Sequence, residues 1–397
     1  MAKTKNYKKT LIACYLGFIT QAISANFVPL LFLTFKNTYG ISLEMIALVP
    51  MVFYLTQLLV DLVATKFADI IGYRTCVVIS QVISSAGLIL MAFLPDILPN
   101  PFIGIILSVV LYAIGSGLIE VLISPIVEAC PFENKSGVMS LLHSFYCWGA
   151  VGVILGSTIF FAIFGTSFWK VLTLIWAIVP LLNTFNFISC PIERLVDDGE
   201  GMRVGNLLRL PLFWLMIILM ICAGASEATM AQWASAFTES ALGVSKVVGD
   251  LAGPCLFAIL MGLARVFYGK FSEKLDLTKA MLGCGALCVL CYLLASLSSI
   301  SIIGLIGCAL CGLSVGIMWP GTISISSQKC PRGGTAMFAF LALAGDLGAM
   351  VSPAMVGGIA DATGGNLKTG LLFATAFPIV MIIGLILLVK KFGKHIR

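Results

Sequence analysis

Residues 102–125 read FIGIILSVVLYAIGSGLIEVLISP, an apolar stretch in which Glu120 is the single charged residue. About 20 consecutive apolar residues in a helix cross a hydrocarbon core of roughly 30 Å, so this stretch is predicted to span a lipid bilayer. A carboxylate at that depth costs roughly 2.5–3.5 kcal/mol on insertion scales. Glu120 is therefore predicted to be a functional residue that faces water, a partner or a proton.

The composition of the whole chain indicates an integral membrane protein. Of its 397 residues, 60% are hydrophobic and 11% are charged, whereas soluble domains carry roughly 25% charged residues. The mean hydropathy is +1.07. Apolar windows long enough to span a bilayer recur twelve times, which predicts an all-α fold of twelve transmembrane helices.

The lysines and arginines predict the orientation of these helices. An even number of spans places both termini on one side, and with the termini in the cytoplasm all but four of the 24 basic residues lie on that side. This asymmetry follows the positive-inside rule, so the net charge of +6 reflects topology and not a nucleic-acid partner. We expect a multi-pass, monomeric protein of the inner (cytoplasmic) membrane. The four basic residues that this topology places outside the cytoplasm are Lys36, Lys170, Lys246 and Lys368.

The cysteines do not predict a metal centre. Cys288-x-x-Cys291 and Cys308-x-x-Cys311 have zinc-like spacing, but they lie in apolar spans without polar loops around them. Free cysteines in such places pack as small hydrophobic residues. No cofactor is expected, and scattered carboxylates with one deep histidine do not predict an enzyme.

Local sequence matches between the two halves of the chain indicate a duplication. Gly117-Leu118 with Pro125 is matched by Gly312-Leu313 with Pro320 at the same spacing. The polar stretch between the two halves predicts a linker at 190–209, between six-helix bundles at 1–189 and 210–397. Parallel repeats of this kind hold their substrate near the midplane of the membrane.

The loop after the second span resembles a motif of the major facilitator superfamily. Residues 65–74 read TKFADIIGYR, and the superfamily's loop reads Gly-x-Leu-Ala-Asp-Arg-x-Gly-Arg-Arg. Asp69, Gly72 and Arg74 match it. Gly72 permits a tight turn, and Asp69 can pair with a helix N-terminus or a basic residue. These three residues are predicted to form a latch between the bundles.

The same loop in the second half places a further pair near the predicted cytoplasmic ends of spans two and eight. Residues 67–69 (FAD) correspond to residues 271–273 (FSE). This alignment sets Asp61 opposite Arg265, and both are predicted to act as gate residues.

Spans four and five resemble the fucose permease and its fucose–glucose–sialoside transporter group. Residues 115–126 read GSGLIEVLISPI, against a family pattern of Gly-x-Gly-x-x-Glu-Thr-x-x-Asn-Pro-Phe. Residues 139–152 read MSLLHSFYCWGAVG and contain the group's Leu-His-x-Phe-x-x-x-Gly-Ala pattern. The resemblance implies a proton symporter in which Glu120 loads and unloads the proton. His143, one span away, is predicted to share that proton, and its alternative role is a bond to a backbone carbonyl.

The remaining polar and aromatic residues inside the spans are candidates for substrate binding. A sugar has apolar ring faces and a rim of hydroxyl groups, so its site needs aromatic platforms, amides and carboxylates. Asn26 stands where the family has an acid in span one. The other candidates are Glu227, Gln232 and Trp233 in span seven, Trp319 in span ten and Asp346 in span eleven. The alternative for both tryptophans is helix packing.

These observations predict a secondary active transporter that imports a neutral, hexose-like monosaccharide by proton symport and alternating access. Two alternatives remain open: sodium coupling in place of protons, and a proton-coupled drug or metabolite efflux antiporter.

Overall fold

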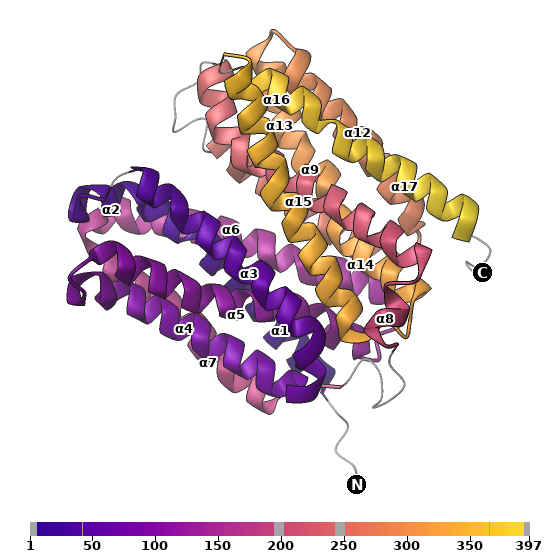
Figure 1. Ribbon diagram of the computed structural model, residues 1–397, viewed down its shortest axis with the longest axis horizontal. Coiled ribbons are helices and arrows are strands. Elements are labelled where there is room, and N and C mark those ends of the chain that lie inside the picture. Colours follow the sequence, from indigo (N-terminus) through magenta and orange to yellow (C-terminus); the bar gives the residue numbers. More distant parts are fainter. Residues whose placement is uncertain (1–5, 42, 194–201, 243–250, 365, 393–397) are drawn as a thin grey trace. The chain divides into compact units, whose positions relative to one another are not determined.

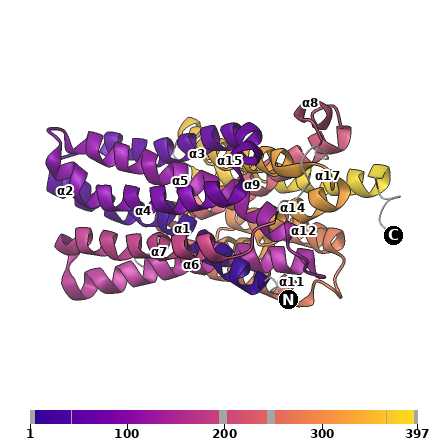
Figure 2. The ribbon, with the colours of Figure 1, turned by 90° about the horizontal axis from the view of Figure 1, so that it is seen from below.

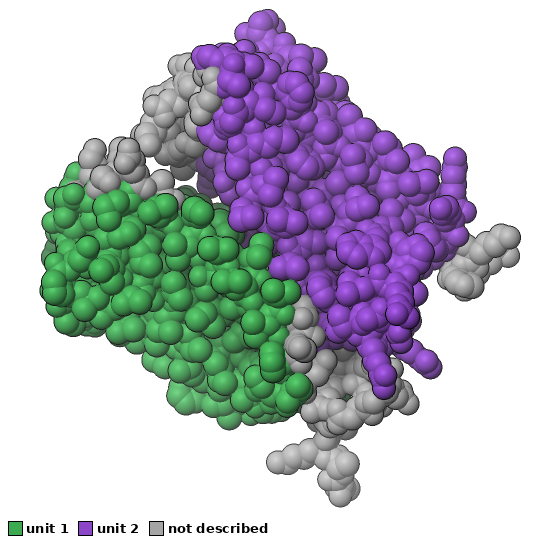
Figure 3. All heavy atoms as spheres, viewed as in Figure 1, with its two compact units in different colours: residues 1–131, 148–197 green, residues 132–147, 198–397 purple. Residues whose placement is uncertain are grey.

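The computed structural model describes residues 6–41, 43–193, 202–242, 251–364 and 366–392, and within these ranges it contains helices and no strand. The chain divides into two compact units (Figure 3). Unit 1 comprises Met1–Pro131 and Trp148–Asp197, and unit 2 comprises Phe132–Cys147 and Asp198–Arg397. Each unit is described by itself below.

Unit 1 is a bundle of long helices in which α4 packs along α5 and α7, and α3 along α5 (Figures 1 and 2). The described elements are α1 (Tyr7–Asn26), a 3₁₀ turn (Val28–Leu31), α2 (Phe32–Tyr39), α3 (Leu43–Ile71), α4 (Tyr73–Ile97), α5 (Pro101–Ala129), the second half of α6 (Lys135–Phe164), a 3₁₀ turn (Thr166–Phe168) and α7 (Trp169–Ser189).

Unit 2 is a second helical bundle, in which α9 packs along α15 and α17, and α13 along α11 and α12. Its described elements are the first half of α6, α8 (Val204–Leu207), α9 (Pro211–Leu242), a π turn (Leu251–Cys255), α11 (Leu256–Phe271), α12 (Leu277–Leu297), α13 (Ser301–Val315), α14 (Met318–Lys329), α15 (Gly334–Ala362), α16 (Leu367–Ala374) and α17 (Ala376–Phe392).

The lengths and apolar character of these helices confirm the predicted twelve-helix membrane fold. In the described part of the chain, 11 helical segments are long and apolar enough to cross a membrane. A shorter apolar segment, Leu48–Ala64, lies inside α3 and corresponds to the predicted second span. In a bilayer a helix satisfies the backbone hydrogen bonds of each segment internally, which explains why these segments are helical.

The boundary between the two compact units falls within α6. The first part of α6 belongs to unit 2 and the part from Trp148 onward belongs to unit 1. The predicted boundaries at 1–189, 190–209 and 210–397 followed the polar linker instead, and they stay a prediction about how the chain is duplicated.

Glycines allow α9 and α15 to approach closely in unit 2. A Cβ atom placed on Gly224 would lie 2.1 Å from the carbonyl oxygen of Gly345, and one on Gly348 would lie 2.2 Å from that of Ile221. Small residues at such contacts let backbones meet, as is common in membrane helix pairs. The close contact brings α9, which carries Glu227, against α15, which carries Asp346.

The predicted tenth span is a broken helix. It consists of α13 and α14, with Gly316 and Ile317 forming a turn between them. Pro320 explains the break, because it has no N–H with which to bond the carbonyl of Gly316 four residues earlier. The break leaves that carbonyl available to another donor.

Candidate functional site

Glu120 lies on α5 in unit 1 and is half-buried. Its Oε2 atom accepts hydrogen bonds from two side-chain amides: Gln21 on α1, at 2.8 Å, and Gln57 on α3, at 2.9 Å. Three helices thus meet at one carboxylate oxygen. Gly117, one turn earlier on α5, makes this possible, because a Cβ there would lie 3.0 Å from Val60 of α3.

This arrangement suits a carboxyl group that gains and loses a proton. An ionised carboxylate accepts from amide N–H groups, and a protonated one can still accept through its carbonyl oxygen. Both amides can therefore stay bonded to Oε2 when the carboxyl group is protonated.

Two other candidates lie in unit 1. Asn26, the last residue of α1, is half-buried, and its amide nitrogen donates to the carbonyl of Ala22 at 2.9 Å. That bond fixes the side chain and leaves the amide oxygen as the atom that can accept from a ligand. Asp61 on α3 is fully buried.

The loop motif has a clear structural role in unit 1. Gly72 has φ +91°, a conformation that favours glycine, and it joins α3 to α4. Arg74 donates to the carbonyls of Phe187, Ile188 and Cys190, each at 2.8 Å. Because the last carbonyls of a helix lack partners within it, Arg74 caps α7. The latch role of these residues stays a prediction.

The side chain of Asp69 lies outside the part of the chain that the structure describes. Its predicted latch role therefore stays a prediction as well.

Arg265 on α11 organises the interior of unit 2 and is 2% exposed. One terminal nitrogen pairs with the carboxylate of Glu227 on α9 at 3.0 Å. The other donates to the carbonyl of His143 at 2.9 Å and to Cys147 Sγ at 3.1 Å. Nε donates to the Gly316 carbonyl at 2.7 Å. Burial of this guanidinium is tolerated because each of its three nitrogens donates to an acceptor.

The bond to Gly316 connects sequence to site. Pro320 leaves the Gly316 carbonyl without a helical donor at the break between α13 and α14. Arg265 supplies the missing donor through its Nε–H group. The proline of the duplicated Gly-Leu…Pro pattern thus creates a specific acceptor for the deep arginine.

The first half of α6 is joined to α11 by further contacts within unit 2. Ser140 Oγ donates to the carbonyl of Arg265 at 2.8 Å, and Asn134 Nδ2 donates to Ser272 Oγ at 2.7 Å. A Cβ on Gly269 would lie 3.0 Å from the carbonyl oxygen of Gly137, so the two helices approach closely.

His143 lies in this segment and is 6% exposed. It belongs to unit 2 and Glu120 to unit 1, so the predicted sharing of a proton between them stays a prediction. The backbone of His143, and not its imidazole, is the part that bonds Arg265.

The span-seven candidates differ in their surroundings. Trp233 is half-buried, and its indole N–H donates to the carbonyl of Pro353 on α15 at 2.9 Å. Its ring lies near Gly357, where an added Cβ would be 3.0 Å away. Gln232 is exposed. Glu227, the third candidate, is 19% exposed and is paired with Arg265.

In unit 2, Trp319 packs against the residue that precedes Asp346. The indole ring of Trp319, at the start of α14, covers the backbone of Gly345, where a Cβ would be 2.2 Å from the ring. Asp346 is the next residue on α15 and is 6% exposed.

Sequence reasoning missed Gln21 and Gln57, the two amides that hold Glu120. A signal was present: each is a polar amide within an apolar span, where side chains of this kind bond to other helices. It also missed the pairing of Glu227 with Arg265, because nothing in the local sequence indicates that α9 and α11 present these residues to each other.

The apolar helices and the buried, hydrogen-bonded charges define a polytopic α-helical membrane protein. The chain belongs to the Major Facilitator Superfamily, whose family model matches residues 13–353. Members of this superfamily are transporters. A membrane protein, MosC of Rhizobium meliloti, is 24% identical over 352 residues, which cover 87% of this chain and 82% of MosC.

Solved structures share the fold at low sequence identity. FucP in the outward conformation, named in a further structure as the E. coli fucose:proton symporter, superposes with a TM-score of 0.79 at 16% identity. That match covers 94% of this chain and 97% of FucP. The proton:xylose symporter XylE gives a TM-score of 0.80 at 12% identity, over 96% of this chain and 95% of that one.

Proposed function

We propose that this protein is a secondary active transporter that imports a neutral monosaccharide together with protons. The observation that carries the proposal is the carboxyl of Glu120 in the apolar α5, held by the amides of Gln21 and Gln57. The shared fold of the fucose:proton symporter FucP and the proton:xylose symporter XylE supports it.

Proton coupling is favoured over sodium coupling by the orientation of the two amides. Both present Nε2 to Glu120 Oε2, and an N–H group cannot ligate a cation. A sodium ion is coordinated by carbonyl and other oxygens. The amides therefore stabilise the charge on Glu120 themselves, which suits a group whose exchanging ion is a proton.

A neutral substrate is favoured by the state of the buried arginine. Arg265 is bonded to a carboxylate, two carbonyls and a thiol. An anionic substrate would have to displace these partners before it could use the guanidinium. Hydroxyl groups, by contrast, need donors and acceptors of the kind that Asn26 and Asp346 offer.

The test uses purified protein reconstituted in liposomes that contain a pH-sensitive dye. Adding the correct monosaccharide outside should acidify the interior of wild-type liposomes. Glu120→Gln should abolish this proton flux but retain exchange of labelled sugar, because glutamine keeps the shape and hydrogen bonding of the side chain but carries no exchangeable acid proton.

Glu133→Gln is the matched control, since it makes the same change at an exposed position shortly after the same helix and should keep both activities. Proton flux that persists in Glu120→Gln would assign coupling to another group. Two results would contradict the proposed function itself: a proton flux that requires sodium, and the absence of a proton flux with every monosaccharide tested.

A further inference from the structure

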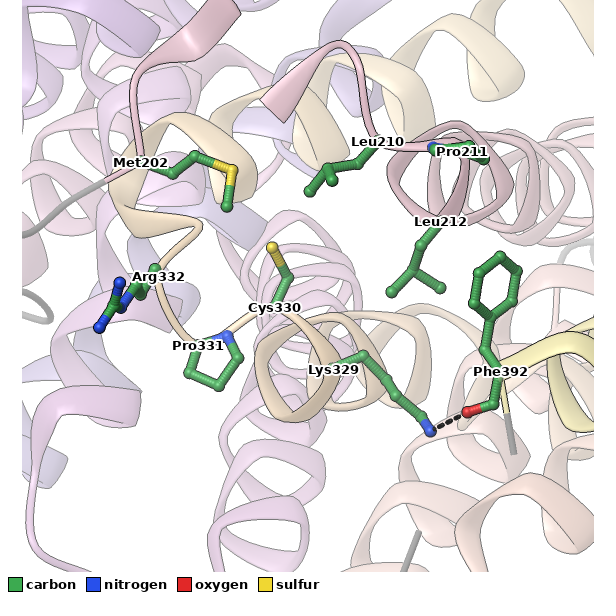
Figure 4. A pocket seen from close by; sticks show the side chains of 9 residues that line it. All are labelled: Met202, Leu210, Pro211, Leu212, Lys329, Cys330, Pro331, Arg332 and Phe392. Carbon is green, nitrogen blue, oxygen red and sulfur yellow. Dashed lines mark hydrogen bonds between the residues drawn. The ribbon is translucent and has the colours of Figure 1, made fainter. Parts of the chain in front are cut away.

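A hollow of about 490 Å³ opens in unit 2, away from the residues described above (Figure 4). Four stretches that are distant in the sequence form its wall: Met202 before α8, residues 210–212 at the start of α9, residues 329–332 between α14 and α15, and Phe392 at the end of α17. Pockets of roughly 300–1,000 Å³ hold small-molecule ligands.

The lining has the character of a binding site for an amphiphile. Two lining residues, Lys329 and Arg332, are cationic, and none of the nine is acidic. Figure 4 shows them toward opposite edges of the pocket, with the Cys330 thiol between them. The remaining six residues are apolar: Met202, Leu210, Pro211, Leu212, Pro331 and Phe392.

The two cations are suited to a phosphate group. Lys329 Nζ donates to the carbonyl of Phe392 at 2.7 Å (Figure 4), which fixes the ammonium at the pocket wall and leaves its two other N–H donors for a ligand. Arg332 is exposed, and its planar guanidinium can form paired hydrogen bonds to phosphate oxygens.

The position of the pocket along the helices indicates where such a ligand comes from. Pro211 is the first residue of α9, Lys329 is the last of α14, and Phe392 is the last of α17. The ends of membrane-spanning helices lie at the level of the lipid headgroups. The distribution of basic residues predicts that this is the cytoplasmic side, where membranes carry anionic lipids.

We propose that this pocket binds an anionic phospholipid. One acyl chain packs against Leu210, Leu212 and Phe392, and the anionic headgroup lies near Cys330, where Lys329 and Arg332 attract its negative charge from opposite edges of the pocket. The backbone N–H of Met202 donates to the carbonyl of Arg332 at 2.9 Å. A bound lipid contacts both the segment before α9 and the loop between α14 and α15, which this hydrogen bond already joins.

Cys330 provides a direct measurement, because its thiol lines the pocket and is half-exposed. Eleven of the thirteen free cysteines are buried, and the other half-exposed one, Cys284, can be removed as Cys284→Ser. The labelling rate of Cys330 by a maleimide is then measured on delipidated protein in neutral detergent, with added phosphatidylglycerol or phosphatidylcholine of identical acyl chains.

Phosphatidylglycerol should slow the labelling at a much lower concentration than phosphatidylcholine. Each basic residue near an anionic lipid contributes roughly a fivefold gain in binding, so Lys329→Gln with Arg332→Gln should raise the half-maximal phosphatidylglycerol concentration about 30-fold. Lys274→Gln with Lys279→Gln is the matched control. Both lysines are exposed on the same predicted side and line no part of the pocket.

Three outcomes would overturn the proposal. Equal protection by the two lipids would mean that the headgroup is not recognised. Equal weakening by the two double variants would mean that general charge attraction, and not the pocket, accounts for the effect. Protection by a single-chain anionic detergent at the same concentration as phosphatidylglycerol would assign the pocket to amphiphiles other than phospholipids.

Discussion

Replacing Arg265 with methionine should destabilise unit 2 strongly. Methionine keeps the apolar stem of the side chain but removes every donor. The carboxylate of Glu227 would lose its paired cation, and the Gly316 carbonyl would lose the donor that replaces the missing N–H of Pro320. Both acceptors would then remain in an apolar, packed interior.

The size of the effect follows from these two losses. Removing one partner of a buried ion pair costs about 3–5 kcal/mol. The 19% exposure of Glu227 places this pair at the lower end, because water screens part of the charge. A buried carbonyl left without a donor adds about 1–3 kcal/mol. We expect Arg265→Met to lower the free energy of unfolding by about 4 kcal/mol in total.

The measurement is the free energy of unfolding in mixed micelles of neutral detergent and dodecyl sulfate, followed by circular dichroism. Glu227→Gln combined with Arg265→Met should recover about 1–2 kcal/mol relative to Arg265→Met alone, because the unpaired charge is gone. Lys270→Met is the matched control on the same helix. Lys270 is exposed, so its loss should change stability by less than about 0.5 kcal/mol.

A cost below about 1 kcal/mol for Arg265→Met would refute this reasoning, since it is the range of an exposed ion pair. Absence of recovery in the double variant would equally refute it. In that case the loss would come from packing alone and not from an uncompensated carboxylate.

Two further predictions follow from contacts within unit 2. Gly224→Ala should lower the free energy of unfolding by about 1–3 kcal/mol, since its Cβ would meet the Gly345 carbonyl. Gly152→Ala is the control and should have little effect, because nothing lies within 4 Å of a Cβ there. Equal thermal stability of the two variants would contradict the close contact of α9 and α15. If Trp233 is a platform for the sugar, Trp233→Phe should keep the transport KM within about threefold while Trp233→Ala raises it about tenfold, because phenylalanine retains the ring face. Unchanged KM in both variants would leave Trp233 as a residue that only packs against α15.

The loop motif shows how far local sequence could reach. Gly72 was expected in a tight turn, and its φ of +91° confirms this, because the requirement is local to one residue. The carbonyl partners of Arg74 could not be predicted, since they lie more than a hundred positions further on in the sequence, at the end of α7. A motif can specify a turn, but the acceptor of a long side chain depends on which helix packs beside it.

The amino-acid sequence alone determined the class of this protein and its most informative residue. Twelve apolar segments of this length are expected to form helices in a bilayer, because a helix satisfies the backbone hydrogen bonds of each segment within that segment. An acid within one of them, Glu120, is conspicuous for the same energetic reason. Both conclusions depend on the solvent around each segment and not on its neighbours.

Only the tertiary structure decided how the buried polar groups are paired. It gave Glu120 the amides of Gln21 and Gln57, and it gave Arg265 the carboxylate of Glu227. Each pair joins different helices, and a hydrogen bond forms only where packing brings donor and acceptor within about 3 Å. A polar residue within an apolar span indicates that the residue needs a hydrogen-bonding partner. Which residue that partner is depends on how the neighbouring helices are rotated and how closely they pack.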